Sequence, residues 1–180
     1  KTPAWYKGHN YHLNNTGGLK LNMNVPIAYG KFTLGGEIRK ENIFSSVLGE
    51  NMEKPIKALF EENAFYSKQS ERLISTGFTG IEQSTEKWDI AAGAAIAHSQ
   101  RFGFQWSGAF NMQYIFNDNL RFFVSGNRAF RLPTFTDLYY KSVSQRSNPL
   151  LKPEYATTFE TGLKLNKNNL KLDVTGFYRA

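Results

Sequence analysis

The side chains best suited to chemistry in this 180-residue chain gather between positions 128 and 160. Three tyrosines there could stack against a ligand, because a tyrosine ring combines an apolar face with a polar hydroxyl: Tyr139, Tyr140 and Tyr155. Two glutamates are candidates for ion pairs with nearby basic residues: Glu154 and Glu160 with Arg128, Arg131 or Lys152. The segment predicts either a small-molecule site or a loop held in shape by its own contacts.

Residues for catalysis or metal binding are not grouped in this way. The sequence has no Gly-x-Ser-x-Gly, no His-Glu-x-x-His, no phosphate-binding glycine loop and no cysteine. His9 and His12 are three residues apart, and side chains at that spacing on a strand point to opposite faces. These two and His98 are predicted to be solvated histidines at strand ends. We therefore predict no enzyme, no cofactor and no metal site.

The elements that must position these residues are long strands of alternating polarity. Successive side chains on a strand point to opposite faces, so a membrane barrel alternates apolar outward and polar inward residues. The alternating run from Phe102 to Phe116 exceeds both the five or six residues of a typical soluble strand and the roughly 9–11 of a membrane strand. Ile115 and Phe123 are exceptions on otherwise polar faces. Because a lipid-facing Lys or Arg at mid-bilayer costs roughly 2–4 kcal/mol, five basic residues are predicted to face inward: Lys20, Lys31, Arg39, Lys164 and Lys171.

The links between strands predict a topology. Nine strands are expected, near residues 5–14, 18–28, 30–40, 71–83, 87–98, 101–116, 119–130, 155–166 and 169–179. Short links such as NNTGG, AYGK, FNDN and NKNN join most of them. The two long connections, Glu41–Ser70 and Arg131–Glu154, both follow odd-numbered strands and therefore leave an antiparallel meander at the same end. Outer-membrane barrels have their longer loops outside the cell, so this end is predicted to be extracellular.

Composition restricts the class of protein further. No apolar run reaches 18 residues, so no membrane-spanning helix is predicted. Fifteen glycines, fifteen phenylalanines and nine tyrosines suit many strands with tight turns and aromatic interface belts. The net charge of +7 is compatible with anionic partners such as the lipopolysaccharide leaflet. The basic residues are spread along the strands, so nucleic-acid binding is not predicted.

Four sequence elements follow one another from the end of one strand to the middle of the next. They are Phe130-Arg131-Leu132-Pro133-Thr134, Leu138-Tyr139, Asn148-Pro149-x-Leu151-x-Pro153-Glu154, and Phe159-Glu160-x-Gly162. In this order and spacing they resemble a signature of the TonB-dependent receptors of the Gram-negative outer membrane. The prolines end strands and form turns. Loop architecture is therefore favoured over ligand contact for most of these residues.

The resemblance implies a single partial barrel domain over residues 1–180, an all-β antiparallel meander of about nine strands from an expected 22. It also implies substrate-specific, TonB-energised import of a scarce nutrient, such as a siderophore or cobalamin, captured at the outer loops. The TonB complex would act through a plug domain, which is expected outside this segment together with the remaining strands. Haem receptors similar to this stretch keep a histidine between the first and third elements. This chain has none between Arg131 and Leu151, which disfavours haem.

Three alternatives remain open. A passive outer-membrane porin or an autotransporter-type barrel would share the alternation but has no reason to carry the signature elements. A soluble β-sandwich also alternates, although its strands are shorter. An outer-membrane hydrolase would use carboxylates and serines, which are plentiful here, but a single sequence does not show that any pair of them lies close together. An upstream plug of about 120–150 residues, the size of one added domain, would separate a receptor from a porin.

Overall fold

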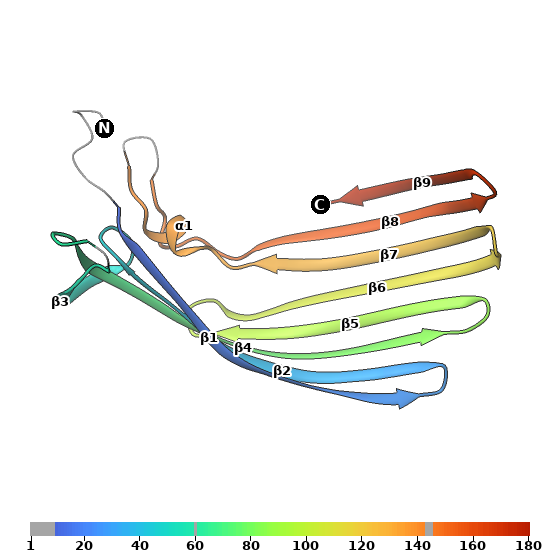
Figure 1. Ribbon diagram of the computed structural model, residues 1–180, viewed down its shortest axis with the longest axis horizontal. Helices are drawn as coiled ribbons and strands as arrows, with labels where there is room; N and C mark the ends of the chain where they lie inside the picture. Colours follow the sequence, from blue (N-terminus) through green and yellow to red (C-terminus); the bar gives the residue numbers. More distant parts are fainter. Residues whose placement is uncertain (1–9, 60, 143–145) are drawn as a thin grey trace. The chain divides into compact units, whose positions relative to one another are not determined.

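The computed structural model describes residues 10–59, 61–142 and 146–180, and they form almost entirely antiparallel β-structure (Figure 1). The strands are β1 His12–Ile27, β2 Gly30–Ser45, β3 Glu50–Lys57, β4 Phe65–Ser84, β5 Trp88–Ser99, β6 Gly103–Asn117, β7 Leu120–Arg131, β8 Glu154–Lys167 and β9 Leu170–Arg179. One short helix, α1, covers Phe135–Tyr139. The sheet follows the order β1-β2-β4-β5-β6-β7-β8-β9, while β3 pairs with β4 beside this path. Within the described residues, β1 and β9 each have one neighbouring strand, so the sheet is unclosed.

The antiparallel meander is confirmed, and every strand predicted from residue 71 onward forms, as β4 to β9. These strands are long: β4 has 20 residues and β6 has 15. Both exceed the usual length of a soluble strand and reach the length that a tilted membrane strand needs. No helix in the described part of the chain is long and apolar enough to cross a membrane.

The predicted break at the NNTGG segment is wrong. Strand β1 runs without interruption from His12 to Ile27 through Gly17 and Gly18. Asparagine and glycine favour turns locally, but the neighbouring β2 extends to Ser45 and offers β1 a hydrogen-bonding partner along this stretch. Pairing therefore overrides the local preference. Most of the predicted strand 5–14 lies outside the described residues.

The predicted long loop from Glu41 to Ser70 is also wrong in part. Its first residues extend β2, its last residues extend β4, and β3 forms between them. Strand β3 pairs with β4 from Lys57 opposite Phe65 to Glu50 opposite Gln69, with an irregularity between the two ends. Its sequence, ENMEKPIK, is charged, contains a proline and lacks clean alternation. The described residues thus form nine strands, as predicted in number, but residues 12–14 of the predicted strand 5–14 belong to β1, and β3 is an additional strand inside the predicted loop.

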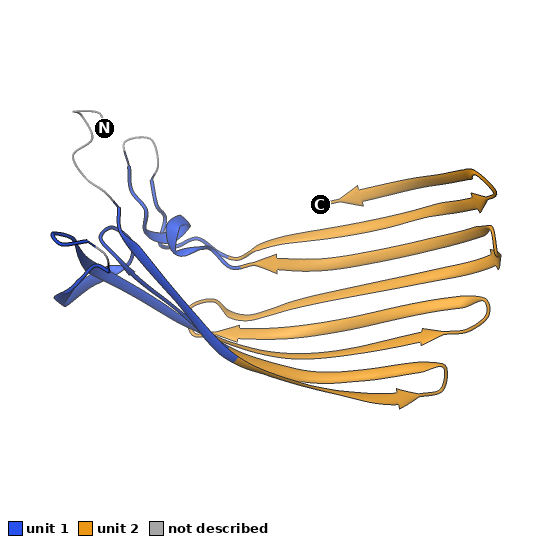
Figure 2. Ribbon diagram, in the orientation of Figure 1, with its two compact units in different colours: residues 1–18, 39–73, 132–152 blue, residues 19–38, 74–131, 153–180 orange. Residues whose placement is uncertain are grey.

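The chain divides into two compact units (Figure 2). Unit 1 contains residues 1–18, 39–73 and 132–152, and unit 2 contains residues 19–38, 74–131 and 153–180. Both predicted long connections therefore belong largely to unit 1. Strands β2, β5 and β7 run in the same direction, so the connections after β2 and β7 leave the unit 2 sheet at one end, here named the connection end. This confirms that the two long connections share one end of the sheet.

The sheet of unit 2 has an apolar and a polar face. One face contains two rows of residues that lie opposite one another on β5, β6, β7 and β8. The first row is Ala92, Phe110, Gly126 and Phe159, and the second is Ile90, Met112, Val124 and Thr161. We name this the apolar face. The other, the polar face, carries Asp89, Gln113 and Asn111 on β5 and β6. Large apolar side chains remain exposed on the apolar face, including Ile96, Trp106, Leu163 and Val174. Such a contiguous exposed apolar surface requires an apolar environment.

Unit 1 has a small core of its own. Ala58, Ala64 and Tyr66 are buried together, with Leu13 and Phe44 packed against them. Ser45 is fully buried and its hydroxyl accepts hydrogen bonds from the backbone N–H groups of Val47 and Leu48. These bonds fix the turn between β2 and β3. The long connections are therefore folded structure and not loose loops.

Candidate functional site

The signature elements begin with a short helix whose start is fixed by its own side chains. The Thr134 hydroxyl accepts a hydrogen bond from the Asp137 backbone N–H at 3.1 Å, and the Asp137 carboxylate accepts one from the Thr134 N–H at 2.9 Å. This reciprocal capping box satisfies N–H groups that a helix start leaves open. Leu138 is 1% exposed and anchors α1 in unit 1. The Thr-x-x-Asp spacing is a signal for this helix that the sequence analysis missed.

Arg72 on β4 holds the start of this segment in place. Its Nε and Nη2 both lie 2.6 Å from Oε2 of Glu41 on β2. Its Nη1 donates to the backbone carbonyl of Pro133 at 2.8 Å, and its guanidinium lies 5.1 Å from the centre of the Phe135 ring. The Arg72 and Glu41 side chains are only 17% and 18% exposed. One arginine thus joins β2, β4 and the signature segment.

A second ion pair between the same strands is very different in setting. Lys40 Nζ lies 2.9 Å from Glu71 Oε2, and both side chains are more than half exposed. The hydrogen bond and the charge of Lys40 lower the pKa of Glu71 below its ordinary value. Exposed pairs contribute little to stability because water screens them. Arg72 with Glu41, and not Lys40 with Glu71, is therefore the structural link in unit 1.

The remaining signature residues form the turn that closes the segment. The Asn148 N–H donates to the Asp137 carbonyl at 3.3 Å, which joins the two halves of the connection. The Asn148 side-chain oxygen accepts from the Leu150 N–H, and its carbonyl accepts from the Leu151 N–H. An asparagine that bonds the backbone two residues ahead is a typical turn former. These contacts support the prediction that the signature is mainly loop architecture.

The candidate ligand tyrosines separate into two groups. Tyr139 and Tyr140 belong to unit 1, where their hydroxyls are hydrogen-bonded with Ser70 at 3.3 Å and with Asn10 at 3.5 Å. Tyr155 belongs to unit 2 and lies opposite Phe130, on the apolar face. That position does not fit the predicted role of Tyr155 in stacking against a captured ligand. Tyr139 and Tyr140 keep theirs as a prediction.

One predicted ion pair forms and another does not. Arg131 lies 3.1 Å from Glu154 through both Nε and Nη2, at the point where β7 and β8 meet. Among the described residues, Glu160 makes no ion pair with any of the three predicted basic partners, because it lies on the polar face opposite Ser125. Arg128 points to the apolar face instead, where it stacks on two aromatic rings.

Gly162 explains the exceptional position of Phe123. These two residues are opposite each other on β8 and β7. A Cβ on Gly162 would lie 2.8 Å from the Phe123 ring and would overlap the Val174 carbonyl oxygen. Without that Cβ, the Phe123 ring covers the glycine on the polar face, and Lys164 Nζ lies 5.1 Å from its centre. The last signature glycine is thus required by close packing.

Replacing Gly162 with alanine is expected to destabilise the pairing of β8 with β9 by about 1–3 kcal/mol, the usual cost of overpacking. The Val174 carbonyl is backbone and cannot move aside without breaking the ladder. Gly176, on the neighbouring strand, has open space around the same position and provides the control. Urea unfolding should show a lower midpoint for Gly162→Ala and an unchanged one for Gly176→Ala.

The histidines do not converge. His12 Nδ1 lies 2.8 Å from the Ser45 hydroxyl, and partial burial there lowers the pKa of His12 below its ordinary value. The His98 ring packs at a tilt against Phe104, with 4.6 Å between the ring centres, on the apolar face. His9 lies outside the described residues. In the described ranges, no three side chains of the metal-ligating types meet.

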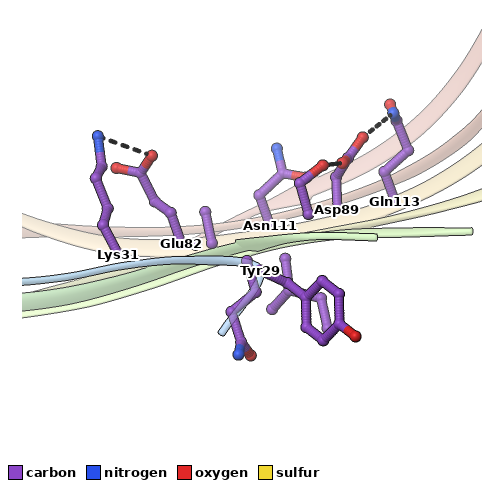
Figure 3. Close-up of a pocket in the computed structure, with 11 residues that line it drawn as sticks. Tyr29, Lys31, Glu82, Asp89, Asn111 and Gln113 are labelled. Atoms are coloured by element: carbon purple, nitrogen blue, oxygen red, sulfur yellow. Dashed lines mark hydrogen bonds and ion pairs between the residues drawn. The ribbon is translucent and has the colours of Figure 1, made fainter. Parts of the chain in front are cut away.

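The polar face carries a hydrogen-bonded network near the turns opposite the connection end. Lys31 Nζ lies 3.2 Å from Glu82 Oε2. The Asp89 carboxylate accepts hydrogen bonds from the Ser84 hydroxyl and from Gln113 Nε2. Figure 3 shows Lys31, Glu82, Asp89 and Gln113 on one side of the sheet and Tyr29 on the other. Lys31 and Lys164 both lie on this face, as predicted for the inner wall of a barrel.

Sequence reasoning missed Arg72, the residue that joins β2, β4 and the signature segment. Arg72 stands in a predicted strand and has no distinguishing neighbours in the sequence. Its role arises from contacts with Glu41 and Pro133, which are 31 and 61 positions away along the sequence. Only a three-dimensional arrangement identifies such a residue.

Comparison with solved structures finds the same fold in longer proteins. A mutant of the ferric enterobactin receptor PfeA from Pseudomonas aeruginosa is 18% identical, with a TM-score of 0.72 over 92% of this chain and 26% of its own. For the siderophore receptor PirA from the same species the values are 17%, 0.73, 93% and 32%. PirA from Acinetobacter baumannii gives 15%, 0.68, 94% and 27%. The chain thus spans about a quarter to a third of these receptors.

The sequence comparison covers nearly the whole chain. No curated protein matches this sequence. Residues 2–180 match the family described as TonB dependent receptor-like, beta-barrel. The signature elements, the long alternating strands and the unclosed nine-stranded sheet agree with this match. The chain therefore belongs to the β-barrel family of the TonB-dependent receptors.

Proposed function

We propose that this chain forms part of the barrel wall of an outer-membrane importer that takes up one scarce nutrient with energy from the TonB complex. The observation that carries the proposal is the folded state of both long connections. Residues 39–73 and 132–152 share one compact unit, fastened by the contacts of Arg72 with Glu41 and Pro133. An ordered surface of this kind suits selective capture, whereas a passive porin does not require it. The role is transport and not catalysis.

The ligand we propose is an iron–siderophore complex captured at unit 1. The similar structures are receptors for siderophores, including ferric enterobactin. Tyr139 and Tyr140 are the aromatic residues of unit 1 that would stack against such a ligand. The net charge of +7 favours an anionic complex over a neutral one. Cobalamin ranks below an iron–siderophore complex as the proposed ligand, because no contact among the described residues favours it.

The polar face of unit 2 would line the conduit of the barrel, and the apolar face would contact outer-membrane lipid and lipopolysaccharide. A Lys or Arg at mid-bilayer is costly on the lipid side, which is consistent with Lys31 and Lys164 on the polar face. A plug domain would occupy the conduit and receive the TonB complex. Residues 1–180 would then be one partial barrel domain of the receptor, located in the outer membrane of a Gram-negative bacterium.

The test removes the signature segment without disturbing the barrel wall. Because Arg131 and Glu154 are directly paired, an Asn-Gly turn can replace residues 132–153 and close the β7–β8 hairpin. Cells producing this variant of the full-length receptor should lose uptake of radioactive iron given as ferric enterobactin. The receptor should still enter the outer membrane and keep its heat-modifiable migration. Replacing Asp118-Asn119, in the β6–β7 turn, by Asn-Gly is the control. Normal uptake by the first variant would refute capture by this segment.

A further inference from the structure

Arg128 is a cation on the apolar face of unit 2. Its guanidinium lies between two aromatic rings, 4.0 Å from the centre of Trp106 and 4.3 Å from the centre of Tyr155. Nη1 also donates to the Trp106 carbonyl at 2.6 Å. The Tyr155 hydroxyl is fixed in turn by a hydrogen bond to Gln105. Trp106, Arg128 and Tyr155 come from β6, β7 and β8, near the connection end, and their contacts fix the position of the guanidinium.

The apolar face has aromatic side chains at both of its ends. Near the turns, the tilted rings of Trp88 and Tyr114 lie 4.6 Å apart, and Tyr114 meets Phe116 edge-on at 4.8 Å. From Trp106 to Tyr114, β6 runs about 27 Å, or roughly 20 Å across a membrane at the tilt usual for such barrels. This is close to the apolar band of about 25 Å between aromatic belts. Trp106 and Arg128 thus lie at the edge of the band, where a cation is tolerated.

The arrangement leaves Arg128 with unused hydrogen-bonding capacity. A guanidinium has five N–H donors. Among the described residues only the Trp106 carbonyl accepts from Arg128, through Nη1, so Nε and Nη2 remain available. Trp106 and Tyr155 are 53% and 47% exposed. Stacking between rings holds the guanidinium plane and keeps its edge free to bind two oxygens of one anion.

We propose that Trp106, Arg128 and Tyr155 form a headgroup site for a phosphorylated glycolipid of the surrounding leaflet, in which Arg128 binds one lipid A phosphate. The charges are complementary, and a phosphate at the edge of the apolar band is at the depth of the guanidinium. The two rings would contact the sugar and the start of the acyl chains. This proposal rests on the proposed outer-membrane location, but it assigns a lipid site distinct from nutrient capture.

The test measures binding of bisphosphorylated lipid A to the full-length protein in detergent micelles, by native mass spectrometry over a lipid titration. Arg128→Gln should bind at least about tenfold more weakly, because a charge-assisted bidentate contact is lost. Arg121→Gln is the matched control, because Arg121 lies on the same strand but on the polar face, opposite Lys164. Its affinity for lipid A should equal that of the unaltered protein. Dephosphorylated lipid A should bind the unaltered protein as weakly as lipid A binds Arg128→Gln.

Two results would overturn the site. One is equal affinity of Arg128→Gln and the unaltered protein for bisphosphorylated lipid A. The other is displacement of lipid A by equimolar inorganic phosphate, which would mean an adventitious anion site only. If Arg128→Gln does not fold, Arg128→Lys takes its place in the test. A lysine keeps the charge but lacks the paired N–H donors of a guanidinium, so its loss of affinity for lipid A should be smaller. Uptake of ferric enterobactin should be unchanged in both variants, so failure of this site is distinguishable from failure of the proposed import.

Discussion

Replacing Arg72 with alanine is expected to release the signature segment from β2 and β4 while leaving the sheet of unit 2 intact. The substitution leaves the Glu41 carboxylate and the Pro133 carbonyl without their shared donor, in a setting where both arginine and glutamate are mostly buried. Hydrogen bonds to charged groups contribute about 1.5–3 kcal/mol each. The local stability of the segment should therefore fall by at least about 2 kcal/mol.

Hydrogen exchange measures this effect directly. The backbone N–H groups of Leu138, Tyr140 and Asn148 are hydrogen-bonded within the segment. A loss of about 2 kcal/mol corresponds to roughly thirtyfold faster exchange at these amides. Amides in the central part of β6 and β7 should exchange as before, because they belong to the ladder of unit 2.

Lys40→Ala is the matched control for this experiment. Lys40 and Glu71 join the same two strands as Glu41 and Arg72, one residue away on each, but their side chains are exposed. Exchange in the signature segment should hardly change in this variant. If Lys40→Ala accelerated exchange as much as Arg72→Ala, the segment would depend on general strand pairing and not on the Arg72 contacts.

The sequence was most informative where a pattern repeats along one strand. Alternation of the kind found from Phe102 to Phe116 predicts both the strand and the face of each side chain, and β6 follows it. The sequence predicted less where a segment becomes a strand because another strand pairs with it. The Asn- and Gly-rich start of β1 and the charged β3 become strands because β2 and β4 pair with them. Local preference alone favours a turn or a loop there.

The candidate site shows the same difference between what residue types predict and what only strand pairing reveals. Pro133, Asn148 and Gly162 could be assigned to architecture from their residue types, and their contacts agree. The positions of Tyr155 and Arg128 on the apolar face follow from the register of β7 and β8, which residue types do not reveal. An arginine among outward apolar residues contradicts simple alternation. Such a departure marks a position where aromatic stacking or a ligand compensates for the charge.

The division into two faces leads to the second large expected effect. Ala92 and Ala91 are neighbours on β5 and point to opposite faces of the sheet. Ala92 lies between Ile81 and Phe110 on the apolar face, level with the middle of the band between Trp106 and Tyr114. Ala91 lies between Glu82 and Asn111 on the polar face. The same substitution at these two positions therefore tests the orientation of the wall.

Ala92→Lys is expected to destabilise the membrane-inserted protein by about 2–4 kcal/mol, because a lysine at mid-bilayer on the lipid side has no polar partner within reach. Ala91→Lys places the same charge directly opposite the Glu82 carboxylate and should cost much less. Urea unfolding of the protein in phospholipid vesicles, followed by tryptophan fluorescence, measures both variants. Equal losses, or a larger loss for Ala91→Lys, would mean that the apolar face does not contact lipid. The lipid site assigned to Arg128 would then fail with it, because both depend on the same orientation of β5 to β8.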